Sequence, residues 1–315
     1  METDWLSILL GASGGLVLFL YAMLRLSEGL KVAAGPGMKE QLARFTGNVF
    51  TGILTGTVIT ILLDSSSAVI MMTIALVSAG QLTFKQSIGV VMGANIGTSV
   101  GSSIIALDIG AWAVVPMLLG LILQLAAQSP KRQAWGRVIF ALGLLFFGLH
   151  TLGGSVAPLR DNPSFSEWMA GLDRPIRGIW VGGLTTVVIQ SSSATVALAI
   201  KLGAQGMLNL PGGIAVMMGA ELGTCSNTLV ATAGQSRAAV RTGVFHLFFN
   251  LLSIFLGWLL FYPFVELIEW LSGGFSLERS IANAHLLFNV IGVVAFAPFA
   301  GLFSRVLLSI IPPKG

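Results

Sequence analysis

Two serine triplets, Asp64-Ser65-Ser66-Ser67-Ala68 and Gln190-Ser191-Ser192-Ser193-Ala194, decide how this chain of 315 residues folds. Each triplet joins two apolar segments that are shorter than the roughly 20 residues of a complete membrane span. These segments cover 45–63, 65–79, 176–189 and 191–205. The pattern predicts two re-entrant helical hairpins, because non-helical tips at membrane depth are tolerated only where they contact protein or water.

A second pair of polar blocks keeps the same spacing as the serine triplets. Gly93-Ala94-Asn95-Ile96-Gly97-Thr98 and Gly219-Ala220-Glu221-Leu222-Gly223-Thr224 are separated by 126 positions (219 − 93), as are Asp64 and Gln190 (190 − 64). No gap is needed between 64 and 98, so the sequence indicates an internal duplication. Three crossings in each copy predict that the second copy is inverted relative to the first.

The composition sets the class of protein. Charged residues make up 10% of the chain and hydrophobic residues 55%, whereas an ordinary soluble domain carries about 25% charged residues. This excludes a soluble enzyme, a nucleic-acid-binding protein and a disordered chain, because too few polar side chains are available to cover a surface in water. The apolar runs are continuous rather than alternating, which predicts an all-α protein embedded in the lipid bilayer rather than a β-barrel.

The predicted crossings divide the chain into two inverted repeats and a C-terminal part. The first repeat, 1–132, holds a leading helix, a hairpin, an interrupted helix and a further helix, the last three at about 45–79, 86–106 and 111–128. The second repeat, 133–262, holds the corresponding elements at about 176–205, 208–233 and 239–262. Residues 263–315 form an interfacial segment and a final transmembrane helix.

Loop charges predict the orientation of these crossings. Basic residues gather on one predicted face, which the positive-inside rule places in the cytoplasm; they include Lys31, Lys39, Arg44, Lys85 and Arg132. The N-terminus is then outside and the C-terminus cytoplasmic, with seven complete crossings. We therefore expect a multi-pass protein of the cell membrane, plasma or inner.

The serine triplets are the strongest candidate binding residues. Hydroxyl and carbonyl oxygens of an unwound tip can converge on a hard cation such as Na⁺, whereas freed N–H groups and helix N-termini suit an anion. Small serines also allow close helix packing, but two triplets in matched positions favour a binding site. The candidates are Ser65, Ser66, Ser67, Ser191, Ser192 and Ser193.

The two Gly-Ala-x-x-Gly-Thr blocks lie inside segments that begin and end apolar. Two glycines flank a polar residue, which predicts a helix interrupted at depth. The polar side chains that such a break would offer as ligands are Asn95, Thr98, Glu221 and Thr224.

Asp64 and Glu221 are the acids that lie deep in apolar segments. Each costs on the order of 2.5–3.5 kcal/mol to insert into a membrane, and the apolar segments offer no clear basic partner. A bound cation would neutralise either carboxylate, so both acids are predicted to take part in binding a coupling ion. A structural ion pair is the alternative.

Two further segments resemble each other near the C-terminus. Each contains His-Leu-x-Phe-Asn, beginning at His246 and at His285. The sequence leaves the role of these segments open: polar contacts between helices, or alternatively a proton relay or support of the ligand. We expect Cys225 to be a small packing residue. It is the single cysteine of the chain, which excludes an internal disulfide.

These blocks resemble the type II sodium–phosphate cotransporter family, which is marked by a duplicated Gln-Ser-Ser-Ser motif, each copy followed by a Gly-(Ala/Ser)-Asn-Ile-Gly-Thr block. Gln190-Ser191-Ser192-Ser193 and the block at 93–98 match as they stand, and the resemblance covers roughly 10–300. It implies inverted repeats, re-entrant hairpins and Na⁺-coupled uptake of inorganic phosphate. It also implies that Ser65 to Ser67 and Gln190 to Ser193 contribute to the phosphate and sodium sites.

The chain departs from this family pattern at two positions. Asp64 stands where the family has glutamine, and Glu221 where it has asparagine. An acid in the pocket repels a divalent phosphate unless cations or protons neutralise it. The coupling ion or the substrate can therefore differ from those of the family.

These observations predict a secondary transporter that moves inorganic phosphate with Na⁺ by alternating access, with no organic cofactor and with assembly as a homodimer left open. The alternative is a Na⁺- or H⁺-coupled transporter of another small anion, such as sulfate or a carboxylate. A serine hydrolase would need an adjacent base, and no histidine is near either triplet in the sequence, so the protein is not expected to be an enzyme. A channel remains a further alternative, to be separated by saturable, gradient-coupled flux.

Overall fold

The computed structural model describes residues 4–35, 37–107 and 109–313, and within these ranges the chain forms helices and no strands. The prediction of an all-α protein is therefore confirmed. The predicted positions of the chain ends involve residues 1–3 and 314–315, which lie outside the described residues.

The first half of the chain contains a long helix, two short helices that are joined at the first serine triplet, and a second long helix. In order, the elements are α1 (Trp5–Ala34), α2 (Met38–Phe45), α3 (Val49–Leu63), α4 (Ser66–Ser78), α5 (Phe84–Ile105), η1 (Gly110–Ala113) and α6 (Val114–Ala126).

The second half repeats this arrangement and then extends it. Its elements are α7 (Pro130–Val156), η2 (Ala157–Asp161), α8 (Pro163–Ala170), η3 (Gly171–Asp173), α9 (Pro175–Ile189), α10 (Ser192–Ala204), α11 (Leu210–Val230), α12 (Arg237–Leu259), α13 (Phe261–Leu271), α14 (Leu277–Phe296), η4 (Ala297–Phe299) and α15 (Ala300–Ile310).

Five described helical segments are long and apolar enough to cross a membrane: Trp5–Ala34, Phe84–Ile105, Pro130–Asp161, Arg237–Leu259 and Leu277–Ile310. Two of the seven predicted crossings are not among them. Gly110–Ala126 is a shorter apolar helix. Helix α11 carries Glu221 and Asn227 among its apolar residues, which lowers its hydropathy.

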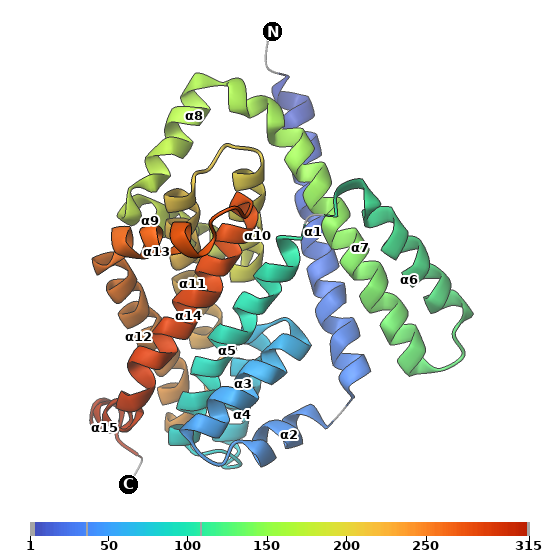
Figure 1. Cartoon of the computed structure of the whole chain (residues 1–315). Helices are drawn as coiled ribbons and strands as arrows, with labels where there is room; N and C mark the ends of the chain where they lie inside the picture. The colour runs from blue at the N-terminus through green and yellow to red at the C-terminus, as the bar shows by residue number, and fades with distance from the viewer. Residues whose placement is uncertain (1–3, 36, 108, 314–315) are drawn as a thin grey trace.

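Helices α1 and α7 lie side by side, and α6 packs on the outer side of α7 (Figure 1). Small residues permit this close approach. A Cβ atom on Gly15 would lie 2.5 Å from the backbone nitrogen of Leu152, and one on Gly136 would lie 2.6 Å from the backbone nitrogen of Gln124. Glycine allows membrane helices to pack backbone against backbone, as observed here.

The duplication is visible in how helices pack on the two long central helices. Gly93 of α5 faces the carbonyl oxygen of Ile53 on α3, and Gly219 of α11 faces the carbonyl oxygen of Ile179 on α9, so that a Cβ atom at either glycine would clash. Gly97 likewise faces Thr60. Residues 126 positions apart (219 − 93 and 179 − 53) therefore make the same backbone contact in both copies.

The prediction that the Gly-Ala-x-x-Gly-Thr blocks interrupt their helices is wrong. Helix α5 is continuous through Asn95 and α11 is continuous through Glu221. The glycines have another role here, because they remove side chains where α3 and α9 press on the two helices. A glycine that lies against a neighbouring backbone needs no helix break to explain it.

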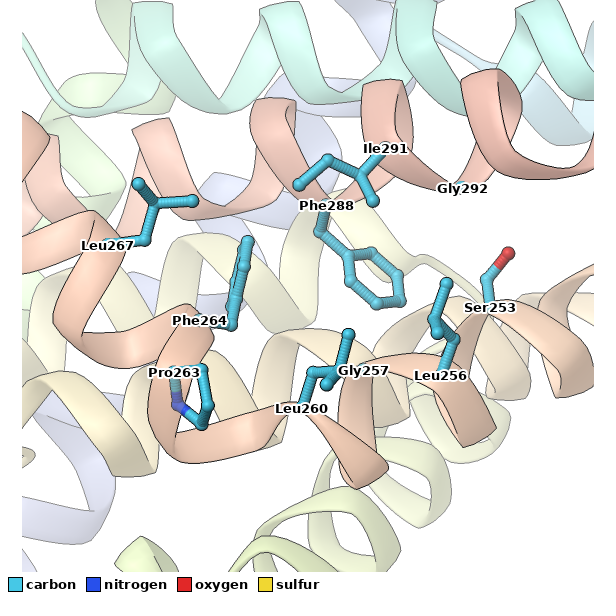
Figure 2. Close-up of a pocket in the computed structure, with 10 residues that line it drawn as sticks. All are labelled: Ser253, Leu256, Gly257, Leu260, Pro263, Phe264, Leu267, Phe288, Ile291 and Gly292. Carbon is cyan, nitrogen blue, oxygen red and sulfur yellow. The ribbon is translucent and has the colours of Figure 1, made fainter.

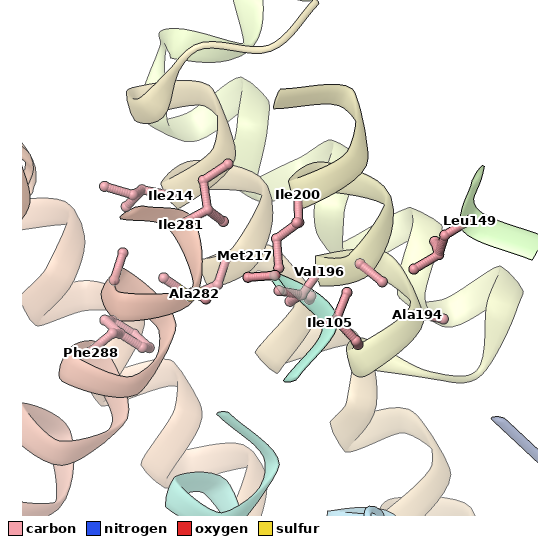
Figure 3. Packing of buried hydrophobic residues seen from close by; sticks show 14 of the residues in the cluster. Ile105, Leu149, Ala194, Val196, Ile200, Ile214, Met217, Ile281, Ala282 and Phe288 are labelled. Atoms are coloured by element: carbon pink, nitrogen blue, oxygen red, sulfur yellow. The ribbon is translucent and has the colours of Figure 1, made fainter. Parts of the chain in front are cut away.

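A buried apolar cluster joins elements from both halves of the chain. Figure 3 shows Ile105 of α5 near Val196 of α10 and Met217 of α11. Ile281 of α14 belongs to the same cluster. This packing holds the second serine triplet against the central helices and so positions the candidate site.

Candidate substrate cavity and a buried polar network

The two serine triplets form tips with the same backbone geometry. Asp64 ends α3 with φ 49° and Gln190 ends α9 with φ 64°. Within the described residues, these are the non-glycine residues with a left-handed backbone. That conformation costs roughly 1–2 kcal/mol for such residues, and strained backbone of this kind concentrates at functional sites.

Each tip then starts a new helix in the same way. Ser65 is the N-cap of α4 and accepts a hydrogen bond from the Ala68 backbone nitrogen at 3.2 Å. Ser191 is the N-cap of α10 and accepts one from Ala194 at 3.2 Å. Serine is a preferred N-cap, and such a cap is worth about 1 kcal/mol. The first serine of each triplet therefore ends the strained turn and begins the helix.

Both tips line one cavity of about 400 Å³. The first tip contributes Asp64 to Ala68, and the second contributes Ile189 to Ser193. Helix α1 closes a third side with Leu20, Met23, Leu24, Ser27 and Lys31. The structure thus brings together Asp64, both serine triplets and Gln190, which the sequence places 126 positions apart.

The cavity lies at the N-termini of two helices. The N-termini of α4 and α10 both begin at it, and the first amides of a helix have no acceptor within their own helix. Two positive helix ends therefore face the same space, which favours a bound oxyanion. Lys31 adds a basic side chain to the lining, whereas Asp64 adds an acidic one.

Sequence reasoning assigned Lys31 to a cytoplasmic loop and did not select Ser27 at all. Both residues lie on α1 and line the cavity. Ser27 and Lys31 lie one helical turn apart, and this spacing is the only feature of the sequence that could have indicated a shared polar face on α1. The spacing does not show which other element that face contacts.

The other predicted ligands lie in a buried polar network between the central helices. Asn95, Thr98, Glu221 and Thr224 are each at most 3% exposed. Thr98 and Thr224 donate to the carbonyl oxygens of Ala94 and Ala220 within their own helices, at 3.0 Å and 3.2 Å. These four residues are not part of the cavity lining, so the structure divides the predicted coupling-ion residues between two places.

Glu221 has a basic partner, contrary to the expectation that the apolar segments offer none. Its Oε1 lies 2.7 Å from Nε2 of His285 on α14, and His285 is fully buried. The other ring nitrogen of His285, Nδ1, lies 2.7 Å from the hydroxyl oxygen of Ser102 on α5. The second His-Leu-x-Phe-Asn segment therefore supplies a histidine that links α5 to α11.

The first His-Leu-x-Phe-Asn segment joins the same network. Nδ1 of His246 lies 2.7 Å from the hydroxyl oxygen of Thr228, and its Nε2 lies 3.2 Å from the side-chain nitrogen of Asn250. Asn250 accepts a hydrogen bond from Asn95 at 2.6 Å and donates one to the carbonyl oxygen of Glu221 at 2.9 Å. Ser102 and Thr228 were not selected from the sequence, because a lone hydroxyl on an apolar helix carries no signal of its own partner. Asn250 is the last residue of the first His-Leu-x-Phe-Asn segment, for which the sequence left polar contacts between helices open.

A second cavity of about 170 Å³ lies between α12, α13 and α14 (Figure 2). Its lining is apolar apart from Ser253, and it includes Phe264, Phe288 and Leu256. This lining suits a hydrocarbon group rather than a charged solute. Among the residues that the structure describes, no group of three or more His, Cys, Asp and Glu side chains is arranged to hold a metal ion.

Comparison with known proteins decides the family. The family model described as Na⁺/Pi-cotransporter matches residues 18–154 and 162–271. The chain belongs to this family. The resemblance carried by the serine triplets is therefore confirmed, and so is the expectation that the protein is not an enzyme, because the family consists of transporters.

Three relatives of this Na⁺/Pi-cotransporter family member illustrate its range. The uncharacterized protein YqeW of Bacillus subtilis is 30% identical over 322 residues, which cover 98% of this chain and 99% of that protein. YjbB of Salmonella typhimurium, whose name assigns it to inorganic phosphate export, is 25% identical over 88% of this chain. The human sodium-dependent phosphate transport protein 2B is 30% identical over 39% of this chain.

The chain spans 51% of the length of the Salmonella protein and 19% of the human protein. No solved structure matches the chain.

Proposed function

We propose that this protein transports inorganic phosphate across the membrane and binds the anion in the cavity between the two serine triplets. The observation that carries the proposal is that the N-termini of α4 and α10 both begin at one cavity. Backbone amides of two helices can hold phosphate oxygens without a fixed positive charge. The names of the Salmonella and human relatives support phosphate as the anion.

In this proposal, the duplication of the chain provides the basis for alternating access. The α3–α4 and α9–α10 pairs are re-entrant hairpins in two inverted repeats, 1–132 and 133–262, followed by a C-terminal part, 263–315. Their tips meet at the anion, and the cell membrane is crossed with the N-terminus outside. The cavity would open to one face and then to the other as one repeat moves against its counterpart.

Sodium is the proposed coupling ion, as in the named human relative. Asp64 is the acid in the cavity lining, and a bound Na⁺ beside it would offset its repulsion of the anion. The serine hydroxyls are hard oxygen ligands of the kind that such a cation prefers. The proposed direction in the cell is uptake; the export named for YjbB would require the opposite orientation of the driving gradient.

Labelled phosphate uptake into liposomes that contain the purified full chain tests this proposal. We expect saturable uptake that requires an inward Na⁺ gradient, with arsenate competing and sulfate and dicarboxylates failing to compete. Ser66→Ala and Ser192→Ala should raise the KM for phosphate, because each substitution removes a hydroxyl group from the first residue of a helix that starts at the cavity. Ser253→Ala, in the apolar cavity, is the matched control and should leave the KM unchanged.

Two results would count against it. Uptake that is indifferent to Na⁺ would remove the coupling ion from the proposal, and equal inhibition by sulfate would change the substrate class. Flux that does not saturate would indicate a channel instead.

A further inference from the structure

We propose that Glu221, His285 and Ser102 form a proton-binding site, which binds and releases one proton in each transport cycle. This inference rests on the proposed function, because the proton would be a second coupling ion. The three residues come from α11, α14 and α5 and form one hydrogen-bonded chain, with 2.7 Å at each of its two contacts. They are 3%, 0% and 0% exposed.

The chain can hold one additional proton without losing a hydrogen bond. In the deprotonated state, the Ser102 hydroxyl donates to Nδ1 of His285, and the Nε2–H group donates to the Glu221 carboxylate. When a proton is added at Nδ1, the Nδ1–H group donates to the Ser102 oxygen, whose hydroxyl rotates toward a carbonyl of its own helix. Rotation of one hydroxyl is thus the only local change, and the imidazolium remains paired with the carboxylate.

The equivalent histidine of the molecule cannot do this. His246 contacts Thr228 just as His285 contacts Ser102, and these hydroxyl residues are 126 positions apart (228 − 102). However, the Asn250 amide nitrogen faces Nε2 of His246, so this nitrogen must accept. Nδ1 then carries the hydrogen and donates to Thr228, which in turn donates to the carbonyl oxygen of Cys225. Protonation of His246 would place an N–H group against an N–H group.

Glu221 is the acid that can balance the charge of a protonated His285. Cys225 and His246 are the other ionisable groups beside it. Remaining charged groups on the helices packed against α11 and α14 lie at helix ends, in η3 or on the exposed face of α13: Lys85, Asp173, Arg177, Lys201, Arg237, Arg241, Glu266, Glu269, Glu278 and Arg279. Against α5, which carries Ser102, the further charged groups are Asp64 at the end of α3, whose carboxyl group faces Gly101, and Arg305, which is exposed on α15. A protonated His285 is therefore balanced by Glu221 and by no second acid in contact with it among the described residues.

The decisive measurement is the number of protons moved per phosphate, with a pH dye inside liposomes and labelled phosphate outside. Phosphate carries protons of its own, so wild type and Glu221→Gln are compared at the same pH. We expect the wild type to move about one more proton per phosphate than the variant, because an imidazolium beside a neutral amide would be buried without a counter-charge. Glu266→Gln, an exposed acid on α13, is the matched control and should behave as the wild type.

A second measurement does not depend on transport. The chain has three histidines, His150, His246 and His285, so ¹⁵N-histidine NMR of the full chain can separate their ring nitrogens after assignment with His150→Gln and His246→Gln. We expect His246 to keep one neutral tautomer as the pH is lowered, while His285 changes from the Nε2–H form to imidazolium. Ser102→Ala should move the midpoint of the His285 change.

These readouts keep the two proposals apart. Wild-type liposomes that take up no phosphate would contradict the proposed function, whereas NMR would still decide the proton site. If His285 keeps one tautomer throughout, or if Glu221→Gln moves as many protons per phosphate as the wild type, the proton site is refuted.

Discussion

The two copies of the duplicated segment share a backbone at their tips but differ in the side chains that line the cavity. Asp64 and Gln190 occupy the same left-handed position, and Ser65 and Ser191 form the same N-cap. One tip, however, presents a carboxylate and the other an amide. Glycine and serine therefore repeat where the backbone requires them, and the copies diverge where charge can be changed without altering the fold.

The same contrast extends to the residue packed behind each tip. The Asn227 side chain donates to the carbonyl oxygen of Gln190 at 3.1 Å. Its counterpart is Gly101 (227 − 126), where an added Cβ atom would lie 2.5 Å from Oδ1 of Asp64. The second tip is thus held by a hydrogen bond from the Asn227 amide, whereas at the first tip the carboxyl group of Asp64 lies beside Gly101.

The largest effect is expected where the copies are alike. Gly219→Ala should cost about 3 kcal/mol or more of the free energy of unfolding, because its Cβ atom would clash with the carbonyl oxygen of Ile179. Helix propensity alone would favour alanine by about 1 kcal/mol, so a loss can be assigned to the clash. Thermal unfolding in detergent measures the effect.

Gly183→Ala on α9 is the control for this variant. Its Cβ atom would lie 3.4 Å from the carbonyl oxygen of Gly219, and threonine stands at the equivalent position 57. A near-native melting temperature is expected. Equal loss in both variants would show that the two helices do not depend on the close contact at Gly219.

A smaller effect on the free energy of unfolding is expected at a threonine hydroxyl that is hydrogen-bonded in one copy but not in the other. Thr186 donates to Thr195 at 2.7 Å, whereas the equivalent Thr60 hydroxyl is buried and has no partner among the described residues. Thr195→Val should cost about 1–3 kcal/mol, and Val69→Thr should gain up to about 1 kcal/mol by giving Thr60 a partner. Denaturation of both variants in one detergent checks the difference. A destabilising Val69→Thr would contradict the equivalence of these positions.

The mildest effect on folding, and a specific effect on transport, is expected from exchanging the tip residues. Asp64→Gln makes the first tip like the second and should weaken the dependence of uptake on Na⁺ about tenfold, or 1.4 kcal/mol. Gln190→Asp adds a second carboxylate to the cavity and should raise the KM for phosphate. The backbone tolerates both changes, since each residue already adopts this conformation at the other tip. Uptake titrated with Na⁺ and with phosphate separates the two; unchanged Na⁺ dependence in Asp64→Gln would remove Asp64 from the ion site.

Much of the molecule could be predicted from the sequence because the relevant forces are local. Short apolar segments around Ser65 to Ser67 and Ser191 to Ser193 predicted chain breaks at the two triplets, because each segment is shorter than a complete membrane span. The glycines of the Gly-Ala-x-x-Gly-Thr blocks led to the wrong prediction that α5 and α11 are interrupted. A glycine that breaks a helix and a glycine that admits a neighbour are identical in sequence, and α5 and α11 proved to be of the second kind.

The sequence by itself determined the membrane class, the duplication and the two tips, because hydropathy, segment length and repeated spacing can be read directly along the chain. Only the tertiary structure decided that α1 lines the cavity with Lys31 and that Glu221 is paired with His285, 64 positions away (285 − 221). A buried carboxylate must find a partner, but which helix supplies it depends on how small residues let the helices approach. The pairing is therefore a property of the packing rather than of either segment alone.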